Sequence, residues 1–418
     1  MKIVLSHPTS NSNVRAIANG FLDAGVLNTF YTSIALFNGS MLHNLSHLKP
    51  FLELKRRGFN MSLKEYVKIY PFYELMRLVA VKIGAKQLLA HETGTFSLEK
   101  CYQAFDKHVA SCLCKKYNKN INAVYAYEDG ALATFTKAKT LGIKCIYDLP
   151  IAYWETGRKL MHEEAKRLPQ WAKTLGGGLL DSQEKLERKT REMELADVVI
   201  VPSHFVRRSV GEWDQGKKII HAPFGSPVLI EDEAANIIKS KQQLNRPLRV
   251  MFAGSMGQRK GLGDLFSAIK LLKGANLELV VMGSLQEPIN FYRNELPDFI
   301  YEPGRPHQQV LELMRTCDVF CLPSIVEGRA LVMQEAMSQG LPLIITPNTG
   351  GEDLIVEGET GFLVPVGSPE KIAEKINWFL ENRNAVDEMG KMAKIHSQKY
   401  TWENYGKQVI EGINTIFQ

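Results

Sequence analysis

Short apolar runs alternate with helical patterns along most of this chain, and this alternation strongly limits the folds open to it. The second half has the clearest examples. The predicted strands there are Leu248–Ala253, Leu277–Met282, Asp318–Pro323 and Pro342–Thr346, and the predicted helices are Leu262–Lys273 and Leu331–Gln339. Strands that alternate with helices of about 10–15 residues predict parallel sheets whose strands are connected by crossover helices.

The first half has the same pattern. Its predicted strands are Lys2–Leu5, Ala123–Tyr127, Lys144–Tyr147 and Asp197–Val201, and its predicted helices are Val14–Ala24, 99–116 and Ala131–Thr140. The pattern lapses from about Pro223 to Pro247, where prolines and an acidic run precede a polar segment. We therefore predict an α/β protein with two doubly wound, Rossmann-like domains, 1–223 and 248–399, joined by a linker over 224–247 and facing a central cleft.

Several classes of protein are excluded by what the sequence lacks. No apolar window approaches the roughly 18 residues of a membrane-spanning helix, and the N-terminus has no secretory apolar region, so we expect a cytoplasmic protein. The six cysteines form no CxxC pair, which predicts reduced thiols and no metal site. A net charge of +6 over 418 residues is too dilute to predict a nucleic-acid partner.

The loop from Phe252 to Gly261 follows a predicted strand, and ligands of doubly wound sheets bind at the carboxyl ends of strands. It contains Gly254, Ser255, Arg259 and Lys260. Glycines let backbone N–H groups approach an anion, and a helix N-terminus adds about half a positive charge. The spacing matches neither GxxxxGK[ST] nor GxGxxG. Two interpretations stay open, a diphosphate site or a glycine-rich turn with two solvated cations.

The loop from Leu322 to Met337 contains two carboxylates. Glu327 falls before the predicted helix and Glu335 about one turn into it, with Leu331 and Val332 at the helix start. One carboxylate can bind sugar hydroxyls and the other a ribose diol, while the amides at the helix start bind phosphate between them. The alternative is a pair of exposed surface acids.

Residues 248–370 resemble the donor domain of the retaining family 4 glycosyltransferases, which have the two-domain GT-B fold. The motifs that carry the resemblance are Lys260-Gly261, the block from Ser324 through Glu327, Glu335 and Pro342, Gly350-Gly351, and Gly361–Val364. The resemblance implies that Glu327 contacts the donor sugar, that Glu335 binds the nucleotide ribose, and that Lys260 holds the diphosphate beside the amides of Leu331 and Val332.

The chain departs from that family at two positions. Ser255 stands where the family usually has arginine, and we predict that Arg259 supplies the missing charge. Ala330 replaces a usual glycine and is expected to narrow the sugar pocket. Gly254, Gly328 and Arg329 complete the predicted donor site. Residues 400–418 are similar to the family's C-terminal helix, which crosses back to the first domain; an ordinary surface helix is the alternative.

The first domain is expected to bind the acceptor. Ser10, Asn11 and Asn13 replace the family's glycine-rich loop, and they contact acceptor or phosphate or else cap the following helix. Asp148 stands where many relatives have histidine, and Glu128 and Asp129 end the preceding predicted strand. Each carboxylate is a candidate to bind the acceptor hydroxyl or act as a base. The alternative is that Asp129 caps a helix and Asp148 is structural.

Residues 41–90 hold nine Lys and Arg residues and three acids, interleaved with aromatic and apolar side chains. Such a segment suits peripheral contact with anionic lipid at the inner membrane face. It also suits a polyanionic acceptor or a solvated helix face.

These observations predict a retaining, metal-independent glycosyltransferase of polysaccharide or glycolipid biosynthesis. It would move a sugar from a nucleoside diphosphate donor to a glycan, lipid-linked or small-molecule hydroxyl. No cofactor is expected besides that co-substrate, whose base (UDP, GDP or ADP) stays open. Two alternatives are a sugar-nucleotide epimerase or phosphorylase on the same fold and a non-catalytic GT-B scaffold; the presence of Glu327, Glu335 and Lys260 argues against the scaffold.

Overall fold

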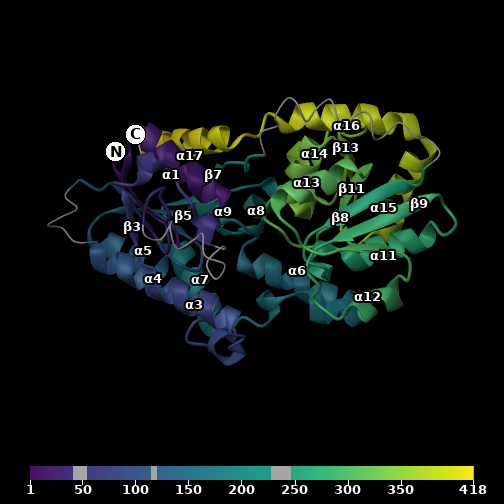
Figure 1. Ribbon diagram of the computed structural model, residues 1–418. Helices are drawn as coiled ribbons and strands as arrows, with labels where there is room; N and C mark the ends of the chain where they lie inside the picture. The colour runs from purple at the N-terminus through teal and green to yellow at the C-terminus, as the bar shows by residue number, and fades with distance from the viewer. Residues whose placement is uncertain (41–53, 114–119, 227–245, 418) are drawn as a thin grey trace.

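The structure is a computed structural model that describes residues 1–40, 54–113, 120–226 and 246–417. It confirms the predicted fold class, since two parallel sheets with flanking helices form two Rossmann-like domains (Figure 1). Within the described ranges, no helix is both long and apolar enough to cross a membrane. The cysteines that the structure describes, Cys101, Cys112, Cys145, Cys317 and Cys321, form no disulfide with one another, and Cys114 lies outside the described residues.

The first domain is built on a seven-stranded sheet with the order β3-β2-β1-β4-β5-β6-β7. The strands are β1 (Ile3–Ser6), β2 (Leu27–Thr32), β3 (Val67–Ile69), β4 (Ala123–Tyr127), β5 (Lys144–Asp148), β6 (Val198–Val201) and β7 (Lys218–His221). The helices are α1 (Ser12–Asp23), α3 (Phe72–Lys82), α4 (Leu98–Cys112), α5 (Leu132–Thr140), α6 (Trp154–Arg167), α7 (Gln183–Leu195), α8 (His204–Ser209) and α9 (Trp213–Gly216). Apolar clusters on both faces of the sheet form its core.

The second domain has a six-stranded sheet with the order β10-β9-β8-β11-β12-β13. The strands are β8 (Leu248–Ala253), β9 (Leu277–Met282), β10 (Ile300–Glu302), β11 (Val319–Leu322), β12 (Leu343–Ile345) and β13 (Gly361–Leu363). The helices are α11 (Leu262–Leu271), α12 (Ile289–Glu295), α13 (His307–Arg315), α14 (Leu331–Ser338), α15 (Pro369–Glu381) and α16 (Arg383–Ser397). Central strands such as β11 are buried along their whole length, because helices cover both faces of a parallel sheet.

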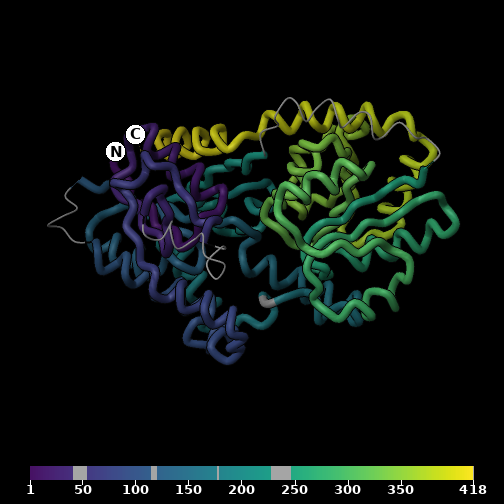
Figure 2. The backbone as a smooth tube through the Cα atoms, viewed as in Figure 1, coloured from purple at the N-terminus to yellow at the C-terminus, as the bar shows by residue number. Residues whose placement is uncertain are grey.

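The last helix, α17 (Trp402–Phe417), returns to the first domain. Tyr405, Val409 and Ile413 of this helix pack in the same apolar cluster as residues of β1 and α1. Figure 2 follows the chain out of the first domain, through the second and back along this yellow helix. The chain therefore crosses between the domains near residues 222–226 and again near 400–402.

A segment of the first half also packs against the second domain. After α6 the chain forms a 3₁₀ turn, Pro169–Thr174, and Trp171 of this turn is buried in the apolar cluster of the second domain. The segment α6 to Thr174, which we call the arm, lies within the predicted first domain 1–223. The core of the second domain thus includes a residue from outside 248–399.

Candidate functional site

The 3₁₀ turn Gln258–Lys260 joins β8 to α11 and carries both cations of the predicted donor loop. The side chain of Lys260 runs beside Gly254. Gly261 ends the turn with φ +75°, and a Cβ at this position would lie 2.0 Å from the carbonyl oxygen of Pro323. Only glycine fits this position, so the backbone of the donor loop approaches the end of β11 closely.

Three charged side chains of the predicted site meet in one group. Lys260 Nζ and Arg259 Nη1 lie 2.6 and 2.5 Å from the same atom, Oε1 of Glu327. Burial lowers the pKa of Lys260 and so does nearby Arg259, whereas the Glu327 carboxylate raises it. Because two cations share one carboxylate, the group keeps an excess positive charge that suits an anionic ligand. That Arg259 supplies the charge missing at Ser255 stays a prediction.

Gly328 is one of the points where this site touches the first domain. Ser203, which follows β6, donates its hydroxyl hydrogen to the carbonyl of Gly328 at 2.6 Å. A Cβ on Gly328 would lie 1.7 Å from the carbonyl oxygen of Pro150, which follows β5. The carboxyl ends of β5 and β6 therefore face the loop between β11 and α14.

The start of α14 supplies the rest of the predicted donor site. Ala330 is the N-cap and donates its N–H to the carbonyl of Thr349 at 3.3 Å. Leu331 and Val332 follow in the first turn, where backbone N–H groups have no intrahelical acceptor and can bind phosphate. Glu335 lies one turn on, and burial raises the pKa of its carboxyl group.

His307 was not among the predicted residues, yet its Nε2 lies 3.1 Å from Glu335 Oε1. It begins α13, in the loop that follows β10. The rule that ligands lie beyond the carboxyl ends of strands would have indicated it, had the three-residue strand β10 been recognised in the sequence.

The Arg329 side chain lies in the interior of the second domain. It is fully buried, and it donates from Nη1 to Asp353 Oδ1 at 2.6 Å and to the carbonyl of Gly350 at 3.1 Å. A third donation, from Nε, goes to Gln334 Oε1 at 2.8 Å. The guanidinium group thus braces the interior of the second domain, and a role of Arg329 in the donor site stays a prediction.

The arm holds the donor loop from the other side. The backbone N–H of Gln258 donates to Thr174 Oγ1 at 2.9 Å, and its side-chain Nε2 donates to Glu164 Oε1 at 2.6 Å. Arg167 bridges Glu164 and Asp264 at 2.6 and 2.7 Å. Gln258 directly precedes Arg259, and Asp264 lies four residues after Lys260. Sequence reasoning missed these contacts because they join positions 84 to 97 residues apart.

The carboxylates Glu128 and Asp129 are engaged with basic residues of α7. Lys189 Nζ lies 2.9 Å from Glu128 Oε1, and Arg188 Nη2 lies 3.0 Å from Asp129 Oδ1. Asp129 does not cap α5, because its carboxylate pairs with Arg188 and Lys189. Its own N–H donates to Glu192 Oε2 at 2.9 Å. The helix start is bound instead by Glu192 and Asp106, so the capping alternative is wrong for Asp129.

Asp148 ends β5, two residues before Pro150, and burial raises the pKa of its carboxyl group to about 7. Its role stays a prediction, as do the roles of Glu128 and Asp129. In the predicted acceptor loop, Ser10 and Asn13 are buried. Asn11 is the N-cap of α1, but its side chain makes no capping hydrogen bond.

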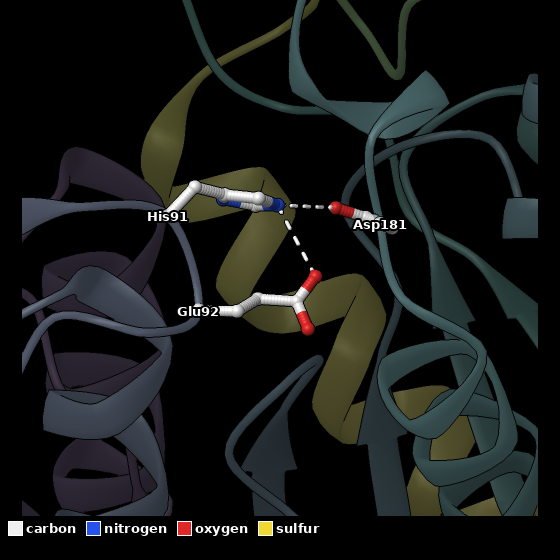
Figure 3. Close-up of side chains that lie close together, drawn as sticks. All are labelled: His91, Glu92 and Asp181. Atoms are coloured by element: carbon white, nitrogen blue, oxygen red, sulfur yellow. Dashed lines mark hydrogen bonds and ion pairs between the residues drawn. The ribbon is translucent and has the colours of Figure 1, made fainter.

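Three side chains far from the donor loop have the composition of a metal site. Ligand atoms of His91, Glu92 and Asp181 lie within 4.8 Å of one another (Figure 3). Lys185 Nζ lies 2.9 Å from the same Asp181 oxygen that faces His91. Ser182 donates its N–H to Glu92 at 2.9 Å. A lysine ammonium group thus already supplies a cation to this cluster, which links α7 to the loop before α4.

Comparisons with known proteins find relatives among glycosyltransferases. The model of the family "Glycosyl transferases group 1" matches residues 234–396. The capsular polysaccharide biosynthesis glycosyltransferase CapM of Staphylococcus aureus is 28% identical over 209 residues, which cover 46% of this chain and 53% of CapM. Sulfoquinovosyl transferase SQD2 of Arabidopsis thaliana is 30% identical over 166 residues, or 39% of this chain and 32% of SQD2. The chain thus spans about half the length of these relatives or less.

Solved structures match along the whole chain. HepE of Anabaena in complex with UDP superposes with a TM-score of 0.61 at 16% identity, covering 99% of this chain and 100% of HepE. Sucrose-phosphate synthase of Thermosynechococcus elongatus gives a TM-score of 0.63 at 17% identity, covering 100% and 99%. At such identities the likeness shows the fold. The chain therefore has the GT-B fold, and its residues 234–396 match the family model of glycosyl transferases group 1.

Proposed function

We propose that this protein is a retaining glycosyltransferase that moves a sugar from a nucleoside diphosphate sugar to an acceptor hydroxyl. The observation that carries the proposal is the group formed by Lys260, Arg259 and Glu327, in which Glu327 lies four residues before the start of α14. Positive charge and free helix amides favour a diphosphate, while the carboxylate favours sugar hydroxyls. The match of residues 234–396 to the family model supports the same reaction class.

The mechanism follows from where charge develops. When the bond from the sugar C1 to the β-phosphate oxygen breaks, negative charge grows on the nucleoside diphosphate. Lys260, Arg259 and the amides of Leu331 and Val332 stabilise that charge in a site that is largely shielded from water. The acceptor oxygen bonds to C1 from the same face, and its proton passes to the leaving phosphate oxygen. Glu327 holds the sugar and Glu335 the ribose.

The donor base and the acceptor stay open, and two printed names guide the first tests. HepE was solved with UDP, and CapM acts in capsular polysaccharide biosynthesis. We therefore propose UDP as the first nucleotide to test and a glycan or lipid-linked sugar as the acceptor class. No cofactor beyond the donor co-substrate is part of this proposal.

A thermal-shift screen of the full chain against UDP, GDP and ADP tests the donor site. A ligand that binds only the folded protein adds about 2.7 kcal/mol of stability at 100 times its Kd, so one nucleotide is expected to raise the Tm clearly. The matching nucleoside, which lacks the diphosphate, serves as the control and should shift the Tm much less. Equal shifts with nucleoside and diphosphate, or no shift with any nucleotide, would contradict the proposed site.

We also propose that the described part of the basic segment, residues 54–90, contacts anionic lipid; residues 41–53 lie outside the described residues. Phe72, Val79 and Ile83 recur along α3 and just beyond it at helical spacing, with exposed fractions of 58, 44 and 70%. Lys64, Lys68 and Lys86 are exposed nearby. An apolar stripe flanked by lysines suits the interface of an anionic bilayer.

Changing both Phe72 and Ile83 to serine is expected to lower binding to vesicles that contain phosphatidylglycerol by about tenfold, because two exposed apolar anchors are lost. Co-sedimentation with vesicles of phosphatidylcholine, with and without phosphatidylglycerol, measures this. Ile395→Ser is the control, since Ile395 is 57% exposed on α16 of the second domain. If wild-type protein stays in the supernatant with both vesicle types, the lipid contact is wrong.

A further inference from the structure

A buried amide on α14 is bonded to the chain where it crosses between the two domains. Gln334 is fully buried, and its Nε2 donates to the carbonyl of Phe224 at 2.7 Å and to Ser226 Oγ at 2.9 Å. Its Oε1 accepts from Arg329 Nε at 2.8 Å. The three bonds use both donors and the acceptor of one side chain, so Gln334 is held on all of its polar atoms.

The same network includes the segment by which the chain returns to the first domain. Ser226 donates its N–H to the carbonyl of Tyr400 at 2.7 Å, and the Arg329 guanidinium lies 4.8 Å from the centre of the Tyr400 ring. A Cβ on Gly225 would lie 2.4 Å from the backbone nitrogen of Trp402. The outward and the returning segments therefore touch each other, and both reach α14 through Arg329 and Gln334.

These contacts connect the predicted donor groups to the interdomain crossing over a short path. Gln334 directly precedes Glu335, and Arg329 directly follows Gly328. A displacement at the start of α14 would break bonds whose partners are buried, and an unpaired buried polar group costs more than a hydrogen bond contributes. The start of α14 and the crossing segments are thus expected to move together.

We propose that Gln334 is a positioning residue that ties the start of α14 to both crossing segments, so that a nucleotide bound at α14 rigidifies the connection between the domains. The effect of the nucleotide rests on the proposed donor site, whereas the connection that Gln334 makes between α14 and the crossing segments does not. Gln334 touches no proposed ligand itself and acts through Glu335, Arg329 and the backbone of Phe224.

Hydrogen–deuterium exchange of the full chain, with and without UDP, tests both the connection made by Gln334 and the effect of the nucleotide on it. The variant is Gln334→Leu, which keeps the size of the side chain and removes all three bonds. Gln339→Leu is a closely matched control, because Gln339 is also buried just past the end of α14, accepts from Arg315 Nε at 2.7 Å and donates to Ser338 Oγ at 2.9 Å. Gln339 bonds to neither crossing segment in the described part of the chain.

Without ligand, Gln334→Leu is expected to speed exchange about tenfold in peptides that include 222–226 and 400–405, about the effect of one lost buried hydrogen bond. Gln339→Leu should leave those peptides unchanged. Exchange like that of the wild type in Gln334→Leu would overturn the tie to the crossing. If the leucine variant does not fold, Ser226→Ala removes one acceptor only and should speed exchange in the same peptides to a smaller extent.

With UDP, wild-type protein is expected to exchange more slowly at 252–261 and 327–335 and also at the two crossing peptides. In Gln334→Leu only the donor peptides should slow. If UDP slows exchange in the donor peptides of the wild type but not in the crossing peptides, the nucleotide does not rigidify the connection between the domains. The proposed function would still stand. If none of UDP, GDP and ADP slows exchange in any peptide, both the proposed donor site and the proposed effect of the nucleotide on the crossing segments are wrong. The comparison without ligand still tests whether Gln334 holds α14 to the crossing segments.

Discussion

Replacing Trp171 by alanine is expected to destabilise the second domain by about 3–5 kcal/mol, the usual cost of truncating a buried tryptophan. Trp171 is 1% exposed, and its ring centre lies 4.9 Å from Phe291, 5.8 Å from Phe266 and 5.9 Å from Tyr292. Its removal leaves a cavity between the arm and α11 and α12. The midpoint of unfolding in urea should fall by roughly 1–2 M, followed by circular dichroism.

Two variants separate this packing role from a general loss of a large side chain. Trp171→Phe keeps an aromatic ring in the cavity and should recover much of the lost stability. Trp213→Ala removes a half-buried ring of the first domain that lies under Lys217, and its effect should be much smaller. A Trp171→Ala midpoint close to that of the wild type would mean that the arm is not part of the core of the second domain.

Most central strands could be predicted from the sequence because burial on both faces leaves nearly continuous apolar runs, but the internal strand β2 was not recognised. β8 and β9 begin and end where they were predicted, and β4 does as well. The four edge strands β3, β7, β10 and β13 were not recognised either, and two of them, β3 and β10, have only three residues each and stay partly exposed. β3 and β10 are strands because their backbones pair with β2 and β9, and a three-residue sequence pattern carries no sign of that pairing.

In the candidate site, too, the features set by local sequence could be predicted and those set by long-range contacts could not. Lys260, Glu327 and Glu335 lie in loops and helix starts after predicted strands, and their placement follows from local sequence. Arg329 lies in the same run, but Asp353 and Gln334 draw its guanidinium inward. The roles of Thr174, Glu164 and Gln334 depend on contacts across the domains, and single polar residues in helical or turn segments carry no sign of such contacts.

Replacing Lys260 by methionine is expected to lower kcat/KM for the donor by about 10²-fold or more, the usual effect of removing one preorganised charge from a developing anion. Methionine keeps an unbranched side chain beside Gly254 and removes only the ammonium group. The measurement is initial-rate kinetics with the donor that the nucleotide screen identifies, together with calorimetric titration of the nucleoside diphosphate. Lys270→Met is the control, because Lys270 lies on the adjoining α11, is 48% exposed, and pairs with Glu295 at 3.6 Å.

The pH dependence of the affinity for the nucleoside diphosphate distinguishes an effect of the Lys260 charge from an effect of its packing. Burial lowers the pKa of Lys260, and only the protonated ammonium group attracts a diphosphate. Wild-type affinity for the nucleoside diphosphate should therefore fall as the pH rises through that lowered pKa, below the range of an exposed lysine. Lys260→Met should start from the weaker affinity and lack this alkaline decline, whereas Lys270→Met should show it unchanged. A wild-type-like affinity in Lys260→Met at neutral pH would mean that another group neutralises the diphosphate.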